Sequence, residues 1–540
     1  MKYGQSIMPN SVNLHSAGLR RGVVCAPHFA AAETGRSILT EGGNAIEAML
    51  AMAASITAVY PHMTHVGGDG FWLIREPSGR VRAIMAPGPT AGRATPELYR
   101  DYETIPTRGP LAALTVPGAV GGWMLAREAA KAHGGKMPLK DLLSPAIMQA
   151  RLGYTVTRSQ ERLTREQFDG LKDVPGFAYA FLLDGKVPPV GAVLKQEALA
   201  ATFEHLIHAG LDDFYRGDVG REIAAELGRI RSPLTREDLQ RYRATLAEPL
   251  RVELPSGTVF NTDAPTQGVV SLIIVALFAR LGVTEAEGFD HVHGLVEATK
   301  RGLQVRDRLV TDPNYLDHSL DRVLDARYLA GETAKIDRRK AAAWPLPANK
   351  GDTIWMGAAD TTGLVVSYIQ SLYWEFGSGC VLPRTGLLMQ NRGASFSLEP
   401  DTLNYLTPGR LPFHTLNPAL AVLKDGRIMA YGCMGGDGQS QTQAAVFTRY
   451  VDFREPLLEA IDRPRWVLGR TWGAPRTALR LESRFDEALI DALAAAGHDL
   501  DVLPDAYSDV MGHAGAAVLH PDGSCEGAHD PRADGGAAGV

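Results

Sequence analysis

The chain has 540 residues, of which 45% are hydrophobic, and a formal net charge of −6 at pH 7. This length suffices for several ordinary domains or for one large layered domain with a sizeable core. The acidic balance argues against a nucleic-acid-binding protein and provides no basic stripe for a membrane surface. No apolar run reaches the roughly 18 residues that a membrane span needs. The longest one, residues 269–281, predicts a buried helix.

The cysteines and the first residues of the chain favour the cytoplasm. Cys25, Cys380, Cys433 and Cys525 are far apart and form no CxxC pair, which indicates reduced thiols rather than a disulfide framework. Residues 1–5 show no apolar signal segment.

The first part of the chain is rich in predicted helices. Apolar periodicity and good helix formers predict helices over residues 45–59, 125–132 and 196–209. A further helix is expected to begin at Arg236, with Thr235 as its N-cap.

The pattern changes to predicted strands beyond residue 352. Residues 363–371 are rich in β-formers and predict a strand. Residues 420–431 predict a hairpin that turns at Asp425-Gly426, and residues 515–527 predict another. Composition and pattern alone therefore indicate a mixed α and β protein, helix-rich before residue 353 and strand-rich after it.

The junction between Asp352 and Thr353 is the strongest chemical signal. It follows residues 338–351, a stretch rich in Lys, Ala and Pro that we expect to be an exposed tether. An N-terminal threonine can act as nucleophile and base, because its hydroxyl attacks while the free α-amine, with a pKa of about 8, accepts the proton. A tether followed by such a threonine predicts a proenzyme that cuts itself before Thr353. Taken alone, a threonine after an aspartate is more simply a surface turn.

Other chemistries have weaker signals. His62, His65 and Asp69 could be imagined as a metal site, but zinc sites need three or four converging ligands and this segment is a glycine loop. Neither a P-loop nor a G-x-S-x-G nucleophile elbow is present.

Five different short motifs occur along the chain in addition to the Asp-Thr junction. In chain order they cover residues 41–48, 61–71, 118–123, 296–301 and 530–532. Each is weak alone, but their common order resembles the γ-glutamyltranspeptidase family of N-terminal-nucleophile hydrolases. The resemblance implies a four-layer α/β/β/α sandwich, in which residues 1–352 and residues 353–540 form one folded unit after cleavage. It implies no metal and no cofactor.

The resemblance also assigns catalytic roles. The register is set by three matches in the strand after the junction, Asp360, Gly363 and Ser367. It makes Thr353 the nucleophile and puts Ser371 where the family has a threonine that hydrogen-bonds it. Gly435 and Gly436 match the paired glycines of the oxyanion hole, where the backbone must approach the substrate closely. The alternatives are a strand-end turn for Ser371 and a merely tight turn for the two glycines.

The predicted substrate pocket departs from the family pattern. Arg392 and Ser395 stand where the pattern has Gln and Asp, Tyr373 replaces an Asn, and His414-Thr415 replaces two serines. The α-ammonium of a γ-glutamyl group would meet a guanidinium instead of a carboxylate. A substrate carboxylate fits better, because arginine can hold it in a bidentate pair. The alternative for Arg392 is a structural ion pair.

This altered set resembles the bacterial subgroup of the family that includes oxamate amidohydrolase. We therefore expect hydrolysis of a small carboxylate-bearing amide, with the conversion of oxamate to oxalate and ammonia as the leading candidate. Three alternatives stay open: a γ-glutamyltransferase or glutathione hydrolase, a glutaryl-type acylase, and a non-processing pseudoenzyme that only binds. The expected partners are the anionic amide, the other fragment, and a second αβ unit in a homodimer. Neither nucleic acid nor a membrane is expected.

Overall fold

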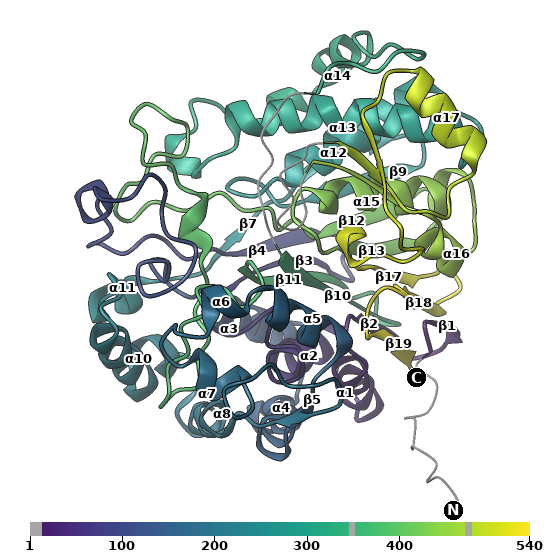
Figure 1. Cartoon of the computed structure of the whole chain (residues 1–540). Coiled ribbons are helices and arrows are strands. Elements are labelled where there is room, and N and C mark those ends of the chain that lie inside the picture. The colour runs from purple at the N-terminus through teal and green to yellow at the C-terminus, as the bar shows by residue number, and fades with distance from the viewer. Residues whose placement is uncertain (1–12, 345–351, 470–477) are drawn as a thin grey trace, which may run out of the picture.

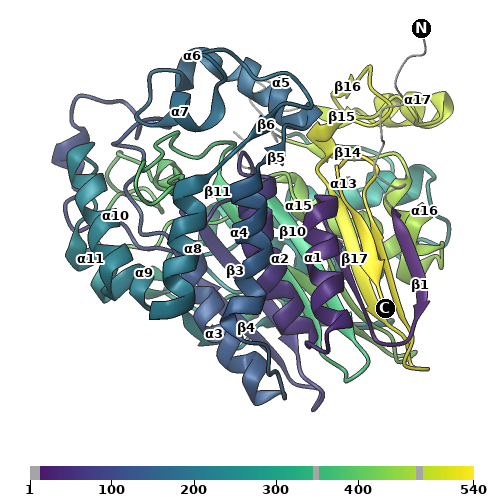
Figure 2. The same cartoon turned by 90° about the horizontal axis from the view of Figure 1, so that it is seen from below.

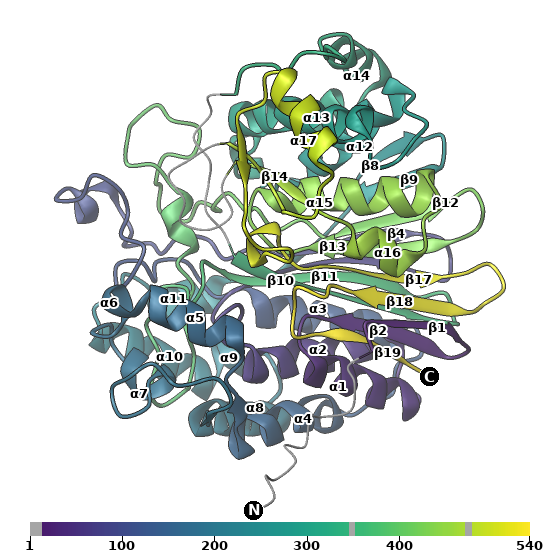
Figure 3. The ribbon, with the colours of Figure 1, turned by 45° about the vertical axis from the view of Figure 1, so that its right-hand side comes forward.

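Two seven-stranded sheets lie face to face between outer layers of helices (Figure 3). The computed structural model describes residues 13–344, 352–469 and 478–540. Neighbouring strands in both sheets are antiparallel. This is the predicted four-layer α/β/β/α sandwich.

The first sheet, here called the β10 sheet, contains the predicted junction. Its order is β19 (Gly536–Gly539), β2 (Gly22–Ala26), β10 (Asp352–Asp360), β11 (Val365–Tyr373), β3 (Asp69–Arg75), β4 (Val81–Ala86) and β7 (Thr245–Ala247). The second, the β13 sheet, has the order β1 (His15–Leu19), β18 (Cys525–His529), β17 (Ala514–Leu519), β13 (Ile428–Cys433), β12 (Ala419–Leu423), β9 (Gly257–Asn261) and β8 (Leu250–Leu254).

Helices cover the outer face of each sheet. Against the β10 sheet lie α1 (Phe29–Thr40), α2 (Ala45–Val59) and α3 (Ala119–Ala132), while α4 (Leu139–Leu152) packs on α2 and α8 (Glu197–Ala209) packs on α4, as Figure 2 shows. Against the β13 sheet lie α12 (Gly268–Leu281) and α15 (Gly438–Phe447), and α13 (Phe289–Leu309) packs on both of them, above α12 in Figure 1. Separate apolar cores fill the space on each outer face and between the sheets.

Smaller elements surround this frame. The remaining helices are α5 (Arg158–Glu166), α6 (Phe168–Leu171), α7 (Phe177–Phe181), α9 (Asp213–Arg216), α10 (Asp218–Arg229), α11 (Arg236–Arg241), α14 (Ala326–Thr333), α16 (Leu457–Asp462) and α17 (Glu487–Ala495). Two small sheets comprise β14 (Trp466–Leu468), β15 (Leu479–Leu481) and β16 (Leu500–Val502), and β5 (Tyr154–Thr155) with β6 (Val193–Leu194). None of the described helices combines the length and the apolar character that crossing a bilayer requires.

The helix α2 illustrates how local sequence fixes these elements. All of its residues are buried, as expected for a run of Ala, Met, Leu and Ile without charges after its first turn. Asn44 and Glu47 form a reciprocal capping box at its start. The carboxylate of Asp360 accepts a hydrogen bond from the backbone N–H of Ala45 at 2.7 Å. The end of β10 is therefore tied to the start of the helix that covers it.

Helices and strands are distributed differently between the two parts of the chain. Most helices do precede residue 353, and the predicted strand and both hairpins are present. However, residues before 353 also supply strands to both large sheets, namely β2, β3, β4 and β7 to one and β1, β8 and β9 to the other. The two parts therefore share their sheets, and β10 lies between β2 and β11.

Candidate active site

Thr353 lies at the start of β10, fully buried between the two sheets and their loops. The pairing register of β10 with β11 shifts between Asp352 and Ile354, so Thr353 occupies an irregular position in the ladder. Such irregularities often re-aim a side chain beside an active site. The Thr353 hydroxyl donates a hydrogen bond to the Ser371 hydroxyl at 3.3 Å. The structure thus brings together the two residues that the sequence register paired.

The helix α15 contributes a second contact to the threonine, which the sequence did not predict. The amide of Gln439 donates to Thr353 Oγ1 at 3.4 Å, and its own oxygen accepts from Asn417 Nδ2 at 3.2 Å. Gln439 belongs to a polar run, residues 438–443, that is completely buried. A run of amides and hydroxyls directly after a glycine loop was the signal available for it, since buried polar groups need a specific reason.

Gly435 and Gly436 form the loop between β13 and α15, next to Gln439. Their φ angles of +115° and +54° lie in the region that favours glycine. Among the described residues, neither backbone N–H has a hydrogen-bond partner. The loop therefore presents two free donors at the N-terminus of a helix, where the backbone dipole favours a negative charge.

Two buried side chains hold this loop in place. Gln267 donates from its amide to the carbonyl of Gly436 at 3.0 Å and to that of Thr415 at 2.8 Å. Arg306 pairs with Asp437 at 2.6 Å and reaches the oxygen of Gln267 at 3.3 Å. The carbonyl oxygen of Gly436 is thus held in place by the Gln267 side chain.

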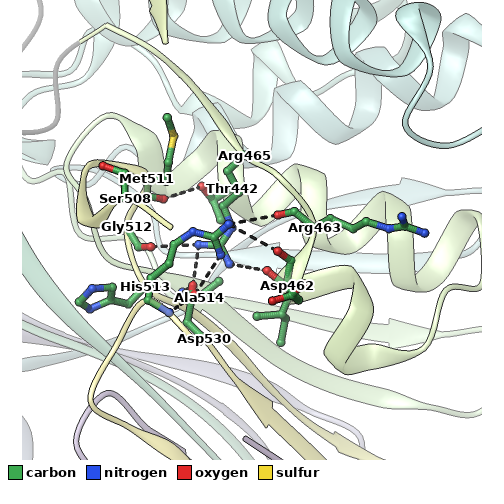
Figure 4. A network of polar contacts seen from close by, with 12 residues as sticks. Thr442, Asp462, Arg463, Arg465, Ser508, Met511, Gly512, His513, Ala514 and Asp530 are labelled. Carbon is green, nitrogen blue, oxygen red and sulfur yellow. Dashed lines mark hydrogen bonds and ion pairs between the residues drawn. The ribbon is translucent and has the colours of Figure 1, made fainter. Parts of the chain in front are cut away.

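A network of buried charges supports the strand before the loop (Figure 4). Arg465 Nη1 lies 2.6 Å from the Asp530 carboxylate and donates to the carbonyl of Gly512 at 3.0 Å. The same carboxylate accepts from the N–H of Ala514 at 2.6 Å. Because β17 begins at Ala514 and pairs with the end of β13, the network fixes the point where the glycine loop starts. This gives the closing Asp-Pro-Arg motif a structural role.

Arg392 lies in a short 3-10 turn, residues 392–395, and is only 1% exposed. Its guanidinium carbon lies 3.9 Å from the ring centre of Tyr373, a cation–π contact. Its Nε and Nη1 atoms have no hydrogen-bond partner. Tyr373 adopts a φ of +84°, and its N–H donates to Ser371 Oγ at 2.8 Å. Contacts therefore run from Thr353 through Ser371 and Tyr373 to the arginine.

Asp69 faces Arg392 and His414, although the sequence analysis assigned it no role in this pocket. Its Oδ2 lies 3.4 Å from His414 Nε2 and has no hydrogen-bond partner, and both ring nitrogens of His414 also lack one. Burial raises the pKa of Asp69 to about 7, although the charge of Arg392 lowers it. Burial and then Arg392 hold the pKa of His414 well below its ordinary value. Burial also lowers the pKa of Arg392, to about 10.

The remaining predicted pocket residues are nearby in sequence but make fewer contacts. The hydroxyls of Ser395 and Thr415 are buried without a hydrogen-bond partner. No described contact joins either hydroxyl to Thr353. We call the cluster formed by Asp69, Arg392 and His414, each of which has an unpartnered polar atom, the anion pocket.

The glycine loop of residues 67–70, which follows His62 and His65, packs closely against the backbone beside the candidate nucleophile. A Cβ atom at Gly68 would lie 2.1 Å from the carbonyl oxygen of Ser371, and one at Gly67 would lie 2.0 Å from that of Leu388. The two metal-binding groups that the described residues could form lie elsewhere, at His293, Glu297 and His498 and at His205, Asp213 and Asp218.

An α/β/β/α sandwich with a threonine at the start of a central strand, beside a paired-glycine loop, defines an N-terminal-nucleophile hydrolase. Comparisons with known proteins narrow this class. The γ-glutamyltranspeptidase family model matches residues 31–540. The oxamate amidohydrolase proenzyme of Klebsiella pneumoniae is 48% identical over 528 residues, covering 97% of this chain and 100% of the relative. The glutathione hydrolase-like YwrD proenzyme of Bacillus subtilis is 37% identical, covering 96% and 98%.

A solved structure agrees with these sequences. The cephalosporin acylase from Bacillus halodurans superimposes with a TM-score of 0.89 at 29% identity, covering 100% of this chain and 99% of its own. The chain belongs to the γ-glutamyltranspeptidase family. The fold and the family predicted from the sequence are thereby confirmed.

Proposed function

We propose that this protein is a self-processing N-terminal-threonine amidohydrolase that acts on a small carboxylate-bearing amide, with oxamate as the leading substrate. The observation that carries the proposal is the buried guanidinium of Arg392, which has two unpartnered nitrogens and connects through Tyr373 and Ser371 to Thr353. A buried cation without a hydrogen-bonding partner is costly, so a ligand that supplies one is favoured.

Processing would use the geometry of the intact chain. The Thr353 hydroxyl attacks the carbonyl carbon of Asp352, the peptide nitrogen is released as the α-amine of Thr353, and water hydrolyses the resulting ester. Ser371 and Gln439, at 3.3 and 3.4 Å from the hydroxyl oxygen, hold this oxygen in place. The products are the fragments 1–352 and 353–540, which stay associated because both sheets contain strands from each.

Hydrolysis would then use the same oxygen. The freed α-amine takes the hydroxyl proton as Thr353 attacks the amide carbon, and passes it to the departing nitrogen, so that ammonia leaves. The developing oxyanion accepts hydrogen bonds from the N–H groups of Gly435 and Gly436, just before α15. Water hydrolyses the acyl-enzyme and restores the threonine. For oxamate, the acid released is oxalate.

The anion pocket supports a short acyl group with a negative end. Arg392, Tyr373 and His414 are large side chains that occupy the pocket close to the nucleophile. A γ-glutamyl group would bring its ammonium next to the Arg392 guanidinium, which like charges oppose. The 48% identity with an oxamate amidohydrolase proenzyme points the same way.

A glutaryl-type acylase is the second candidate, favoured by the structural likeness to a cephalosporin acylase. It would use the same arginine for a longer anionic acyl group. A γ-glutamyl enzyme and a pseudoenzyme that binds without processing are the remaining alternatives. The four buried free cysteines support the cytoplasmic location expected from the sequence. Pairing of two processed units in a homodimer remains part of the proposal.

The test is a substrate panel on the purified, processed protein. Ammonia or amine release is measured with oxamate, a glutaryl amide and a γ-glutamyl anilide under the same conditions. We expect the highest kcat/KM for oxamate and two bands on a denaturing gel. Efficient turnover of the γ-glutamyl anilide would refute the proposal that the anion pocket selects a substrate carboxylate, but it would leave Thr353 as the nucleophile. A single full-length band would point to the pseudoenzyme.

A further inference from the structure

Asp69 uses only one of its two carboxylate oxygens to hold the structure together. Its Oδ1 accepts hydrogen bonds from the N–H groups of Gly88 and Gly118 at 3.0 Å and from the amide of Gln390 at 3.1 Å. Its Oδ2 is buried, accepts nothing and faces His414 Nε2 at 3.4 Å. The side chain is therefore firmly oriented, with one oxygen directed at the histidine.

His414 is held as firmly, but by its backbone and by packing. Its N–H donates to the carbonyl of Pro265 at 2.8 Å, and its carbonyl accepts from the N–H of Gln267 at 2.9 Å. Its ring meets the edge of Phe71 at 4.9 Å between centres. The imidazole thus stays beside Asp69 with both nitrogens unpartnered.

We infer that Asp69 and His414 act as a proton-carrying pair that binds the substrate carboxylate opposite Arg392. The inference rests on the proposed function, because it requires an anionic substrate in this pocket. One proton is shared between Asp69 Oδ2 and His414 Nε2, and Nδ1 then carries the hydrogen that donates to the carboxylate. Asp69 is a positioning residue, and His414 contacts the substrate.

The tautomer of His414 explains why the pair must carry a proton to bind an anion. If Asp69 is ionised and His414 neutral, the ring hydrogen favours Nε2, because the carboxylate accepts it there. Nδ1 then directs a lone pair into the pocket and repels an anion. One added proton removes this conflict whether it sits on Oδ2 or on Nε2, since Nδ1 is a donor in both cases. Binding of the anion therefore takes up one proton from solvent, and its release returns the proton.

Few other groups near the pair can interfere with this titration. The hydroxyls of Tyr215, Tyr242 and Tyr368 lie close to Asp69, but burial raises the pKa of each, so they stay neutral. Arg392 is the remaining charged group that acts on both members of the pair and stays charged near neutral pH. Since the pKa of Asp69 is about 7, the proton is lost within the physiological range.

The test is the pH dependence of inhibition by oxalate, the expected product, in the processed enzyme with oxamate as substrate. The inhibition constant is measured from about pH 6 to about pH 9, a range that spans the ordinary histidine pKa and the raised pKa of Asp69. We expect it to be constant at low pH and to rise about tenfold per pH unit above the pKa of the pair, as linkage of one proton requires. Inhibition constants are used because kcat also reports the α-amine of Thr353.

Asp69→Asn separates this role from a structural one. The asparagine oxygen can still accept from Gly88, Gly118 and Gln390, while its N–H donates to His414 Nε2 and fixes the hydrogen on Nδ1. The inhibition constant should then lose its pH dependence and stay near the low-pH value of the unmodified enzyme. His414→Gln should also be pH-independent, but with weaker binding.

Glu226→Gln is the matched control, because Glu226 is another buried carboxylate that accepts three hydrogen bonds, from the backbone of Arg384 and from Thr385. It should keep the slope of the unmodified enzyme. A flat profile in the unmodified enzyme, or an unchanged slope in Asp69→Asn, would overturn the pair. Absence of both oxamate turnover and oxalate inhibition at every pH would instead overturn the proposed function, and the pair with it.

Discussion

The molecule buries two groups of charged side chains, which differ in how many of their polar atoms have hydrogen-bond or ion-pair partners. In the network of Arg465, Glu482, Asp530 and Arg532, every carboxylate oxygen accepts at least two hydrogen bonds or ion pairs. In the anion pocket, two nitrogens of the Arg392 guanidinium, both ring nitrogens of His414 and one oxygen of Asp69 have no hydrogen-bond partner. Paired buried charges stabilise a fold when geometry is good, whereas unpaired ones are retained at a cost in stability. The difference separates a structural cluster from a site prepared for a ligand.

Loss of the nucleophile should have the largest effect and should leave both clusters intact. Thr353→Ala removes the hydroxyl that both processing and turnover need. We expect a single full-length band on a denaturing gel, no measurable amidase activity and an unchanged unfolding midpoint. Thr353→Ser, which keeps a hydroxyl, should still be cut. N-terminal sequencing of the small fragment must begin at residue 353, and any other start would remove Thr353 from this role.

Breaking the paired cluster should reduce stability and leave substrate binding unchanged. Asp530→Asn leaves Arg465 without its charge partner and Arg532 with Glu482 alone, a loss of about 3–5 kcal/mol for a broken buried pair. Urea unfolding of the processed protein measures this loss in the free energy of unfolding. The KM of the variant that remains folded should stay unchanged.

Acid should weaken the same cluster. Burial raises the pKa of Asp530, but Arg465 and Arg532 together lower it below its ordinary value. A group with a depressed folded pKa contributes its stability above the unfolded pKa, about 3.9, and loses it as pH falls further. The unmodified protein should therefore lose stability below about pH 4 more steeply than Asp530→Asn does.

Removal of an oxyanion donor tests the loop that the paired cluster supports. Gly436→Val should lower kcat by about 10²–10³, equivalent to about 2.7–4 kcal/mol. The valine also strains a backbone with positive φ, so a control with the same strain is needed. Gly409→Val, at φ +77° with open space around its Cβ position, should leave kcat unchanged. A Gly436→Val enzyme with full turnover would place the oxyanion elsewhere.

The anion pocket gives the smallest effect but the sharpest contrast. Arg392→Gln should raise KM for oxamate roughly 10- to 150-fold, because a charge-assisted hydrogen bond contributes about 1.5–3 kcal/mol. The urea midpoint should stay the same or rise, since an unpaired buried cation has been removed.

Arg410→Gln is the matched control for Arg392→Gln. Arg410 also stacks on a tyrosine, but it donates to the carbonyls of Leu403 and Tyr405 and to Thr311. It should lose stability with KM unchanged. If Arg392→Gln behaves like Arg410→Gln, Arg392 is a structural residue.

Elements defined by local signals were well predicted from the sequence. The bounds of α2 coincide with the apolar run, the hairpin turn falls at Asp425-Gly426, and Thr235 caps α11. The N-terminal strands were missed because most are five residues or fewer and take their order from pairing with distant segments, as β2 does with β10.

The site divides in the same way. Thr353 and Ser371 are 18 residues apart on two adjacent strands, so a strand register was enough to pair them. Asp69 meets Gln390 across 321 residues, and Gln439 meets Thr353 across 86. Such contacts depend on how sheets and loops stack, which no short pattern contains. The roles of these residues therefore follow only from the folded arrangement.

The neighbouring ends of the described chain have a consequence for protein engineering. The N–H of Ala537 donates to the carbonyl of Asn13, and that of Arg21 to the carbonyl of Val540, both at 2.9 Å. A short linker could therefore join these segments in a circular permutant in which Thr353 directly follows the initiator methionine. Removal of the initiator methionine would expose the threonine amine directly. Such a protein would have its nucleophile ready on folding, with no peptide bond left to cut.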